Sequence, residues 1–416
     1  MLKYLTLWEK HTQYNNRGVY MAMRAFLYDQ QKRYAEALRT IKEAEDIIRT
    51  DHPTNFYHQF LVAYGNYAWI YYHLTNYSMV KFCLEQINKF CLSLLSPYLY
   101  TVDIPEVEAQ KGWSLLVGGF RNGREAKNCF LRALRKNAFC LEYQAGLAVS
   151  AFACWTSSQN AQDERVAKAW LEMMLPLDPH NYEVKVYLAS MLLHKDNTRV
   201  KYLLDNVVEH SLNPEVLRMA AHLCWQQSLP STAISILRQA LAQDPTYPML
   251  HYDLGLLYKH QMETAPIPEE RTEALSSAIT NFQQAIELDP LFIDPKLELA
   301  KLYGAESPSF EEEVYLNLLD QVPHFTKRCQ QTFYLQWGDF LLRKKGLKHE
   351  AQQQYMAGLQ ISGSRFKELN DRLINLASIF LDDFDVAHFD ALHTFLQRCW
   401  NQRVQGEDLW WFSYRP

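Results

Sequence analysis

Residues 217–245, LRMAAHLCWQQSLPSTAISILRQALAQDP, carry the pattern that decides the fold. On the 34-residue tetratricopeptide pattern, positions 8, 20, 24, 27 and 32 fall on Ala221, Ala233, Leu237, Ala240 and Pro245. Small side chains let the two helices of a repeat approach closely, and larger ones fill the space to the next pair. Five matches at fixed spacing therefore predict a helix-turn-helix repeat.

The same pattern returns on both sides of this stretch. The following copy places Gly255, Tyr258, Ala278, Phe282, Ala285 and Pro290 at equivalent positions, and looser copies begin as early as Ala25 and end near Gly358. Two copies carry insertions between their helices, near residues 154–165 and 261–271. We predict an all-α tetratricopeptide-repeat superhelix, a solenoid of roughly eight to ten helix pairs, because one pair cannot bury its own apolar face. The array is expected to span residues 1–363, with a C-terminal helical cap and aromatic tail over residues 364–416.

Composition supports a helical array and excludes several classes of protein. The 416 residues include only 14 glycines and 16 prolines, as is typical of helices joined by short turns. A formal net charge of −5 provides no general attraction for nucleic acid or an anionic membrane. The 8 cysteines form no CxxC pair, which suits a reducing compartment, and no run of 18 apolar residues occurs. We expect a soluble, cytoplasmic protein.

Motifs for catalysis and for metal binding do not emerge from the sequence. GGFRNG, residues 118–123, lacks the Lys-Ser/Thr of a phosphate-binding loop and is predicted to be a turn between helices. RKKGLKH, residues 343–349, is predicted to be a solvated helix-turn-helix corner, with an RNA or an acidic partner as the other option. The sequence has no HExxH, no GxSxG and no His/Cys set at metal-ligand spacing. We therefore predict no enzymatic activity, no cofactor and no metal.

GNYAWIYYHL, residues 65–74, gathers four aromatic rings and a histidine. Ala68 and Tyr71 occupy repeat positions 8 and 11, so Tyr71 is predicted to pack between helix pairs. Trp69 and Tyr72 are expected to pack likewise. His73 is expected to face solvent or a hydrogen-bond partner near the turn.

Four stretches carry a family likeness: GNYAWIYYHL, PEVEAQKGWSLL, REAKNCFLRAL and MLHYDLGLLYKHQM. They resemble the interferon-induced proteins with tetratricopeptide repeats, a vertebrate antiviral family. The likeness is specific from about residue 65 to residue 261 and fainter from residue 22 to residue 361. It implies a helical superhelix, a cytosolic location, no catalysis, and either recognition of foreign RNA 5′ ends or assembly with sister proteins.

The resemblance assigns candidate RNA contacts to four residues. The tryptophan of the family's GW dipeptide, which stacks on the cap or first base, is Trp113. A glutamate that starts the next helix is matched by Glu142, an asparagine in the turn after DP by Asn181, and an arginine that follows the RNA backbone by Arg218. From the residues alone, Trp113 is either a stacking platform or a core residue, and Arg218 either an anion contact or a solvated side chain.

Other family RNA-contact positions have lost their basic or polar residues. The family's lysine is replaced by Val117, its phosphate-gripping arginine by Ala153, a further arginine by Trp225, and its His-Gln pair by Tyr252 and Asp253. Because phosphate contacts supply much of the affinity for nucleic acid, these changes predict weak RNA binding.

Three functions follow as alternatives. The first is a binding scaffold for sister proteins or other partners, alone or in homo- or hetero-oligomers, with weak binding of single-stranded RNA and no role for DNA or membranes. The second is a binder of foreign RNA 5′ ends in the superhelix groove. The third is a co-chaperone-type clamp for peptide C-termini, for which Arg24 and Asn66 offer only part of a basic series.

Overall fold

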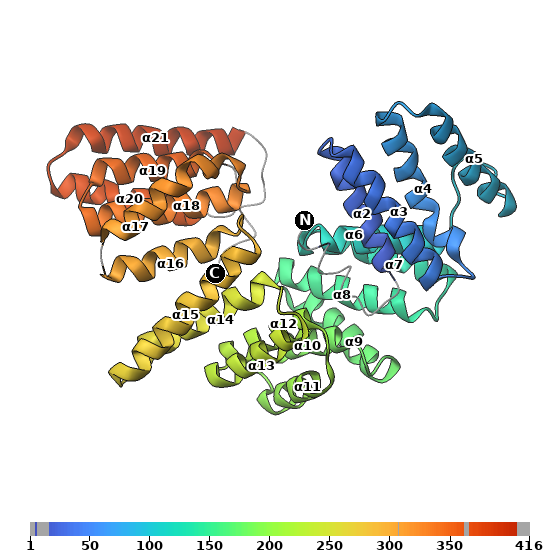
Figure 1. Ribbon diagram of the computed structural model, residues 1–416, viewed down its shortest axis with the longest axis horizontal. Coiled ribbons are helices and arrows are strands. Elements are labelled where there is room, and N and C mark those ends of the chain that lie inside the picture. Colours follow the sequence, from blue (N-terminus) through green and yellow to red (C-terminus); the bar gives the residue numbers. More distant parts are fainter. Residues whose placement is uncertain (1–4, 6–15, 307, 362–365, 406–416) are drawn as a thin grey trace. The chain divides into compact units, whose positions relative to one another are not determined.

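The computed structural model describes residues 5, 16–306, 308–361 and 366–405. Within these ranges the chain forms twenty α-helices and three short helical turns, with no strand (Figure 1). The helices pair in chain order, each with its successor, into ten helix-turn-helix units. This confirms the predicted all-α repeat array at the upper end of the expected number of pairs. Among the described residues, no helix has the length and apolar character needed to cross a bilayer.

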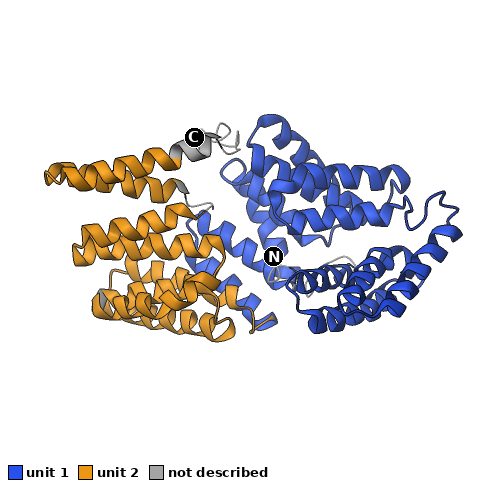
Figure 2. Cartoon of the chain, turned by 90° about the horizontal axis from the view of Figure 1, so that it is seen from above, with its two compact units in different colours: residues 1–243 blue, residues 244–416 orange. Residues whose placement is uncertain are grey.

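The chain divides into two compact units, residues 1–243 and residues 244–416, shown in separate colours in Figure 2. The helices of the first unit are α2 (Arg17–Gln30), α3 (Tyr34–Asp51), α4 (Phe56–His73), α5 (Tyr77–Ser93), α6 (Pro105–Val117), α7 (Gly123–Lys136), α8 (Leu141–Ser158), α9 (Ala161–Leu177), α10 (Tyr182–Leu192), α11 (Asn197–His210), α12 (Pro214–Gln226) and α13 (Pro230–Gln243). Those of the second unit are α14 (Pro248–Thr264), α15 (Pro268–Leu288), α16 (Ile293–Glu306), α17 (Pro308–Leu318), α18 (Lys327–Phe340), α19 (Lys348–Gln360), α20 (Phe366–Asp382) and α21 (Val386–Gln405). The boundary expected at residue 363 lies outside the described residues and stays a prediction.

Within the first unit, the first helix of each pair contacts the first helix of the next pair. These inner helices, α2, α4, α6, α8, α10 and α12, thus form one continuous layer. The second helices α3, α7, α9 and α11 pack on their partners and also on the helix that follows, as α7 does on α8. Side chains at the start of successive inner helices are therefore brought close together.

The core forms where the repeat pattern predicts small and large residues to meet. Gly146 of α8 and Gly112 of α6 both face the ring of Phe130 on α7, so closely that a methyl on Gly146 would lie 2.3 Å from that ring. The second unit repeats the arrangement with Gly255 against Phe282 and with Gly338 against Tyr355. These rings are buried, so each glycine lets an inner helix rest directly on an aromatic ring.

Most residues of the two insertions belong to helices, and each insertion includes the short break between the two helices of its pair. The first lengthens α8 and α9, and Asn160 caps α9 by accepting a hydrogen bond from the amide of Asp163 at 2.8 Å. The second lengthens α14 and α15, and Pro268 begins α15 at a position that needs no amide donor. Both insertions are rich in Gln, Glu, Arg and Ala, which favour helix once a neighbouring helix can be extended.

The aromatic stretch in α4 is only partly buried. Ala68 and Tyr71 lie in the core, as predicted. Trp69 and Tyr72 are 56% and 50% exposed, so the expectation that they pack between helix pairs was wrong. They lie three residues apart and share the solvent-exposed face of α4, where their rings contact each other edge to face. His73 does have a hydrogen-bond partner near the turn, since its Nδ1 lies 2.8 Å from Oδ1 of Asp29.

Candidate binding surface on the inner helices

The four candidate residues lie at successive inner helices of the first unit. Trp113 belongs to α6, Glu142 to the first turn of α8, Asn181 precedes α10, and Arg218 lies on α12. Because α6, α8, α10 and α12 contact one another in this order, the residues follow one layer of the repeat array. Trp113 and Glu142 are brought into direct contact.

Trp113 is a core residue in this structure, with only 2% of its surface exposed. Its ring meets Phe130 edge to face, with the ring centroids 5.0 Å apart. Its indole Nε1–H donates a hydrogen bond to Oε1 of Glu142 at 3.1 Å. The indole therefore joins α6, α7 and α8, and in this arrangement its faces are covered by the protein.

Glu142 is half-buried, and its surroundings change its acidity. Removal from water raises its pKa to about 7, and the nearby carboxylate of Glu106 adds to the rise. The hydrogen bond from Trp113 opposes it, because an indole N–H stabilises the charged carboxylate. Glu142 can therefore gain or lose a proton near neutral pH.

A second half-buried acid with an aromatic hydrogen-bond donor lies on α10. The hydroxyl of Tyr187 donates to Oε1 of Glu183 at 2.8 Å. Burial raises the pKa of Glu183, and Glu215 of α12 raises it further. Four consecutive inner helices thus begin with acidic residues, Glu106, Glu142, Glu183 and Glu215. Sequence reasoning missed three of the four, although a glutamate in the first turn of each inner helix was a visible signal.

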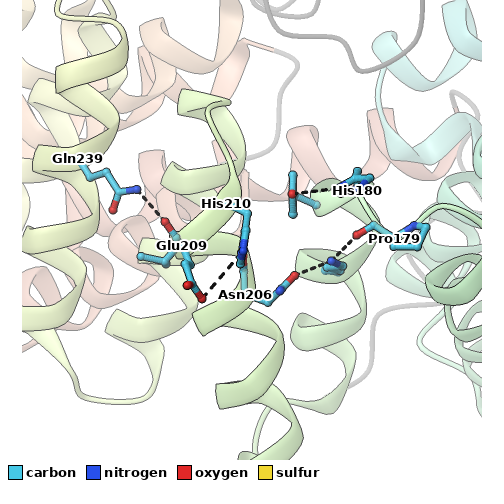
Figure 3. A network of polar contacts seen from close by, with 9 residues as sticks. Pro179, His180, Asn206, Glu209, His210 and Gln239 are labelled. Carbon is cyan, nitrogen blue, oxygen red and sulfur yellow. Dashed lines mark hydrogen bonds and ion pairs between the residues drawn. The ribbon is translucent and has the colours of Figure 1, made fainter.

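Asn181 holds the turn that leads into α10. It is buried, and its Oδ1 caps the helix by accepting a hydrogen bond from the amide of Val184 at 3.2 Å. Its Nδ2 donates to Oδ2 of Asp178 at 3.3 Å. In Figure 3 the neighbouring carbonyl of Pro179 is linked to Asn206 of α11 through an amine, which is that of Lys185. The side-chain amide of Asn181 therefore supports the local structure at the start of α10.

Arg218 is engaged by the carboxylate at the start of its own helix. Its Nε and Nη2 donate to the two carboxylate oxygens of Glu215 at 2.7 and 2.8 Å, and Nη1 lies 3.3 Å from Nε2 of His222. Such a bidentate pair neutralises much of the field that a phosphate would feel.

The positions that have lost basic or polar residues are built into helix packing. Ala153 is fully buried, and a methyl placed on Gly123 would lie 2.8 Å from its Cβ. Val117 is buried at the end of α6, and Trp225 is half-buried beside His222. Asp253, in the second unit, is buried as well.

Aromatic rings that sequence reasoning did not single out fill the space between α8, α10 and the turn after α6. Phe152 stacks on Tyr187 with the centroids 4.5 Å apart, and Phe120 meets both rings edge to face. Phe120 belongs to the GGFRNG stretch, which forms the predicted turn, a 3-10 helix (Phe120–Asn122). Gly119 precedes it with φ +116, a conformation that favours glycine.

The residues suggested for a peptide clamp lie on α2 and α4. Asn66 donates its Nδ2 hydrogen to the carbonyl of Ala22 at 3.2 Å, so it links the two inner helices.

Comparison with known proteins finds similar sequences over most of the chain. No family model matches the sequence. It is 30% identical over 356 residues to the antiviral innate immune response effector IFIT1 of Macaca fascicularis, which covers 82% of this chain and 73% of that protein. It is 29% identical over 393 residues to human interferon-induced protein with tetratricopeptide repeats 2, covering 89% of this chain and 81% of that protein.

Solved structures agree on the fold. A monomeric IFIT1 mutant with Gppp-AAAA superposes with a TM-score of 0.67 at 23% identity, covering 97% of this chain and 94% of that one. A human IFIT1 dimer with PPP-AAAA gives a TM-score of 0.65 at 24% identity, covering 99% and 93%. At this identity the structures establish the repeat superhelix.

Proposed function

The chain belongs to the interferon-induced proteins with tetratricopeptide repeats, and we propose that it is a non-enzymatic antiviral effector that acts as a binding scaffold for partner proteins. Support comes from relatives that are named antiviral innate immune response effectors and from the shared repeat architecture. Repeat arrays of this kind offer a long, regular surface for partners. A cytoplasmic location, where viral products and sister proteins would be met, is part of the proposal.

One observation carries the choice of a scaffold over an RNA 5′-end binder. The inner helices of the first unit begin with four acidic residues, while two of the family's basic RNA-contact positions hold the buried apolar side chains of Val117 and Ala153. The one candidate arginine, Arg218, is paired with Glu215. At this surface a triphosphate would therefore meet carboxylates, and it would lack the basic side chains that contact RNA in the family.

The decisive experiment is a mobility-shift titration of the full chain with 5′-triphosphate and 5′-hydroxyl single-stranded RNA at several salt concentrations. We expect weak binding with little preference for the triphosphate. Nanomolar, salt-sensitive binding that requires the triphosphate would overturn the scaffold and favour the RNA alternative. Co-purification of a sister protein in a stoichiometric complex would support the scaffold.

The RNA 5′-end alternative rests on solved structures of IFIT1 with capped and triphosphate oligonucleotides. In that case Trp113, Glu142, Asn181 and Arg218 are the residues we propose as RNA contacts. Trp113→Ala should then weaken RNA binding in a variant that remains folded by circular dichroism. Unchanged affinity would exclude a stacking role.

The co-chaperone alternative has a direct test of its own. A fluorescent peptide ending in EEVD, titrated with the full chain, should not bind if the chain is a scaffold. Micromolar binding that depends on Arg24 and Asn66 would favour the clamp.

A further inference from the structure

We propose that His349, Asp385 and His388 form a binding site for a divalent transition-metal ion such as Zn²⁺. The site lies within the second unit and joins the start of α19 to the turn between α20 and α21. It is independent of the proposed function, because none of its residues belongs to the inner helices of the first unit.

The distances between the three side chains suit a shared ion. One ligand atom from each residue can be chosen so that all lie within 4.8 Å of one another. Nδ1 of His388 lies 2.9 Å from Oδ1 of Asp385, and Nε2 of His349 lies 3.9 Å from Oδ2 of the same carboxylate. Neighbouring ligands of a tetrahedral zinc ion, with bonds of about 2.0 Å, are separated by about 3.3 Å. Small side-chain rotations would therefore bring all three ligands into range.

Rigid elements hold the three ligands in place. His349 is in the first turn of α19, and His388 is in the first turn of α21. Asp385 precedes α21 and accepts a hydrogen bond from the amide of His388 at 3.3 Å, as a helix cap does. The ring of Phe380 on α20 stacks on both imidazoles, 5.4 Å from His349 and 5.6 Å from His388. Ordering the ligands before binding lowers the entropic cost of capturing an ion.

The chemistry of the set also favours a metal. The centroids of the two imidazole rings lie 3.9 Å apart, and imidazole nitrogen is a ligand that zinc and related ions commonly bind. Lys348, which precedes His349 in the sequence, is paired with Asp383, so its charge is offset. Two histidines and one carboxylate match zinc and related ions, and partial exposure leaves further positions for water.

Sequence reasoning could not find this site. The motif RKKGLKH drew attention as a basic corner, yet its histidine meets its partners only through the packing of α19, α20 and α21. The prediction of no metal considered only ligands that lie close together in the sequence. Of the three residues, only Asp385 and His388 do so.

The test is a titration of the metal-free full chain with Zn²⁺ in competition with a chromogenic chelator. We expect the wild type to bind one more equivalent than the His349→Gln/His388→Gln double variant. Each single variant should bind that equivalent at least tenfold more weakly, since even loss of an outer-shell partner costs about 10- to 100-fold. His393→Gln provides the matched control, because His393 is exposed on α21 one turn beyond the site and does not belong to it.

A second measurement separates metal binding from folding. Without metal, the double variant should unfold at the same temperature as the wild type, since the ligands are exposed or only half-buried. Added Zn²⁺ should raise the melting temperature of the wild type and of His393→Gln, but not that of the double variant. Equal zinc stoichiometry and affinity in wild type and double variant would overturn the proposal, as would an equal loss in His393→Gln.

Discussion

The carboxyl group of Glu142 makes the stability of the first unit depend on pH. Its pKa is raised from 4.5 to about 7 in the folded protein, first because burial removes it from water. Between these two values the folded state holds a proton that the unfolded state has released. The stability that this proton contributes is complete below about pH 4.5 and is lost as the pH rises through 7.

Glu142→Gln should therefore stabilise the protein at pH 8 and have little effect at pH 4.5. The amide oxygen can still accept the hydrogen bond from Trp113, while the cost of a buried charge disappears. We expect a gain on the order of 1–3 kcal/mol at pH 8, given about 1.4 kcal/mol for each pKa unit and partial exposure of the group. Urea unfolding at the two pH values measures it.

Glu209→Gln is the matched control, since Glu209 is an exposed glutamate on α11. Its effect should be small and independent of pH. A Glu142→Gln variant that is equally stable relative to wild type at both pH values would show that Glu142 titrates normally.

The residue scale also marks the limit of sequence-based prediction. The resemblance selected Trp113 and Glu142 together, and the structure joins them by a hydrogen bond. The side-chain direction of Trp113 could not be predicted, because a tryptophan beside position 8 can point to the core or away from it. The pairing of Arg218 with Glu215, three residues apart, could have been anticipated from helical spacing.

At the scale of the helix pair, glycines pressed against aromatic rings determine how closely the inner helices approach. Gly146→Ala would place a methyl 2.3 Å from Phe130, so α8 or the ring must move. We expect a loss of about 1–3 kcal/mol, the usual cost of an overpacked core. The midpoint of urea unfolding, followed by circular dichroism, measures the change.

Gly65→Ala is the contrasting control in the same unit. Gly65 lies inside α4, and a methyl there would meet nothing within 4 Å. Alanine should stabilise the helix by about 0.5–1 kcal/mol. If both substitutions stabilise the protein, close packing on Phe130 does not limit the approach of α8. The double variant Gly146→Ala/Phe130→Leu should lose less stability than the sum of the losses in the two single variants.

Helix pairs are also the level at which the sequence was most informative. The spacing of Ala221, Ala233 and Leu237 predicted an inner helix, an outer helix and their contact face, and all three residues are buried. The sequence placed the insertions between the helices of their pairs but did not show that most of their residues would be helical, because residues such as Ser157 are typical of loops. Trp69 and Tyr72 were misplaced because an aromatic-rich helix gives no contrast between its two faces.

At the scale of the whole molecule, the question is whether charge alone keeps RNA from binding. The net charge of −5 gives no general attraction, so affinity must come from local cations. Two of the family's basic positions are less deeply buried than Ala153, which is fully buried. These are Val117, 9% exposed at the end of α6, and the half-buried Trp225 on α12.

The double variant Val117→Lys/Trp225→Arg should therefore bind 5′-triphosphate RNA at least tenfold more tightly than wild type at low salt. Two added phosphate contacts should steepen the dependence of log affinity on log salt by about 1.4, at about 0.7 per contact with single strands.

Leu212→Lys/Tyr202→Arg introduces the same two residues at exposed sites on or beside α11 and gives the matched control. Both double variants change the net charge by the same amount. Equal gains in RNA affinity would therefore show that the effect comes from the overall charge and not from the two positions. A gain confined to the first variant would place the RNA-contact positions on α6 and α12, and no gain in a folded variant would mean that their lost charges do not explain weak binding.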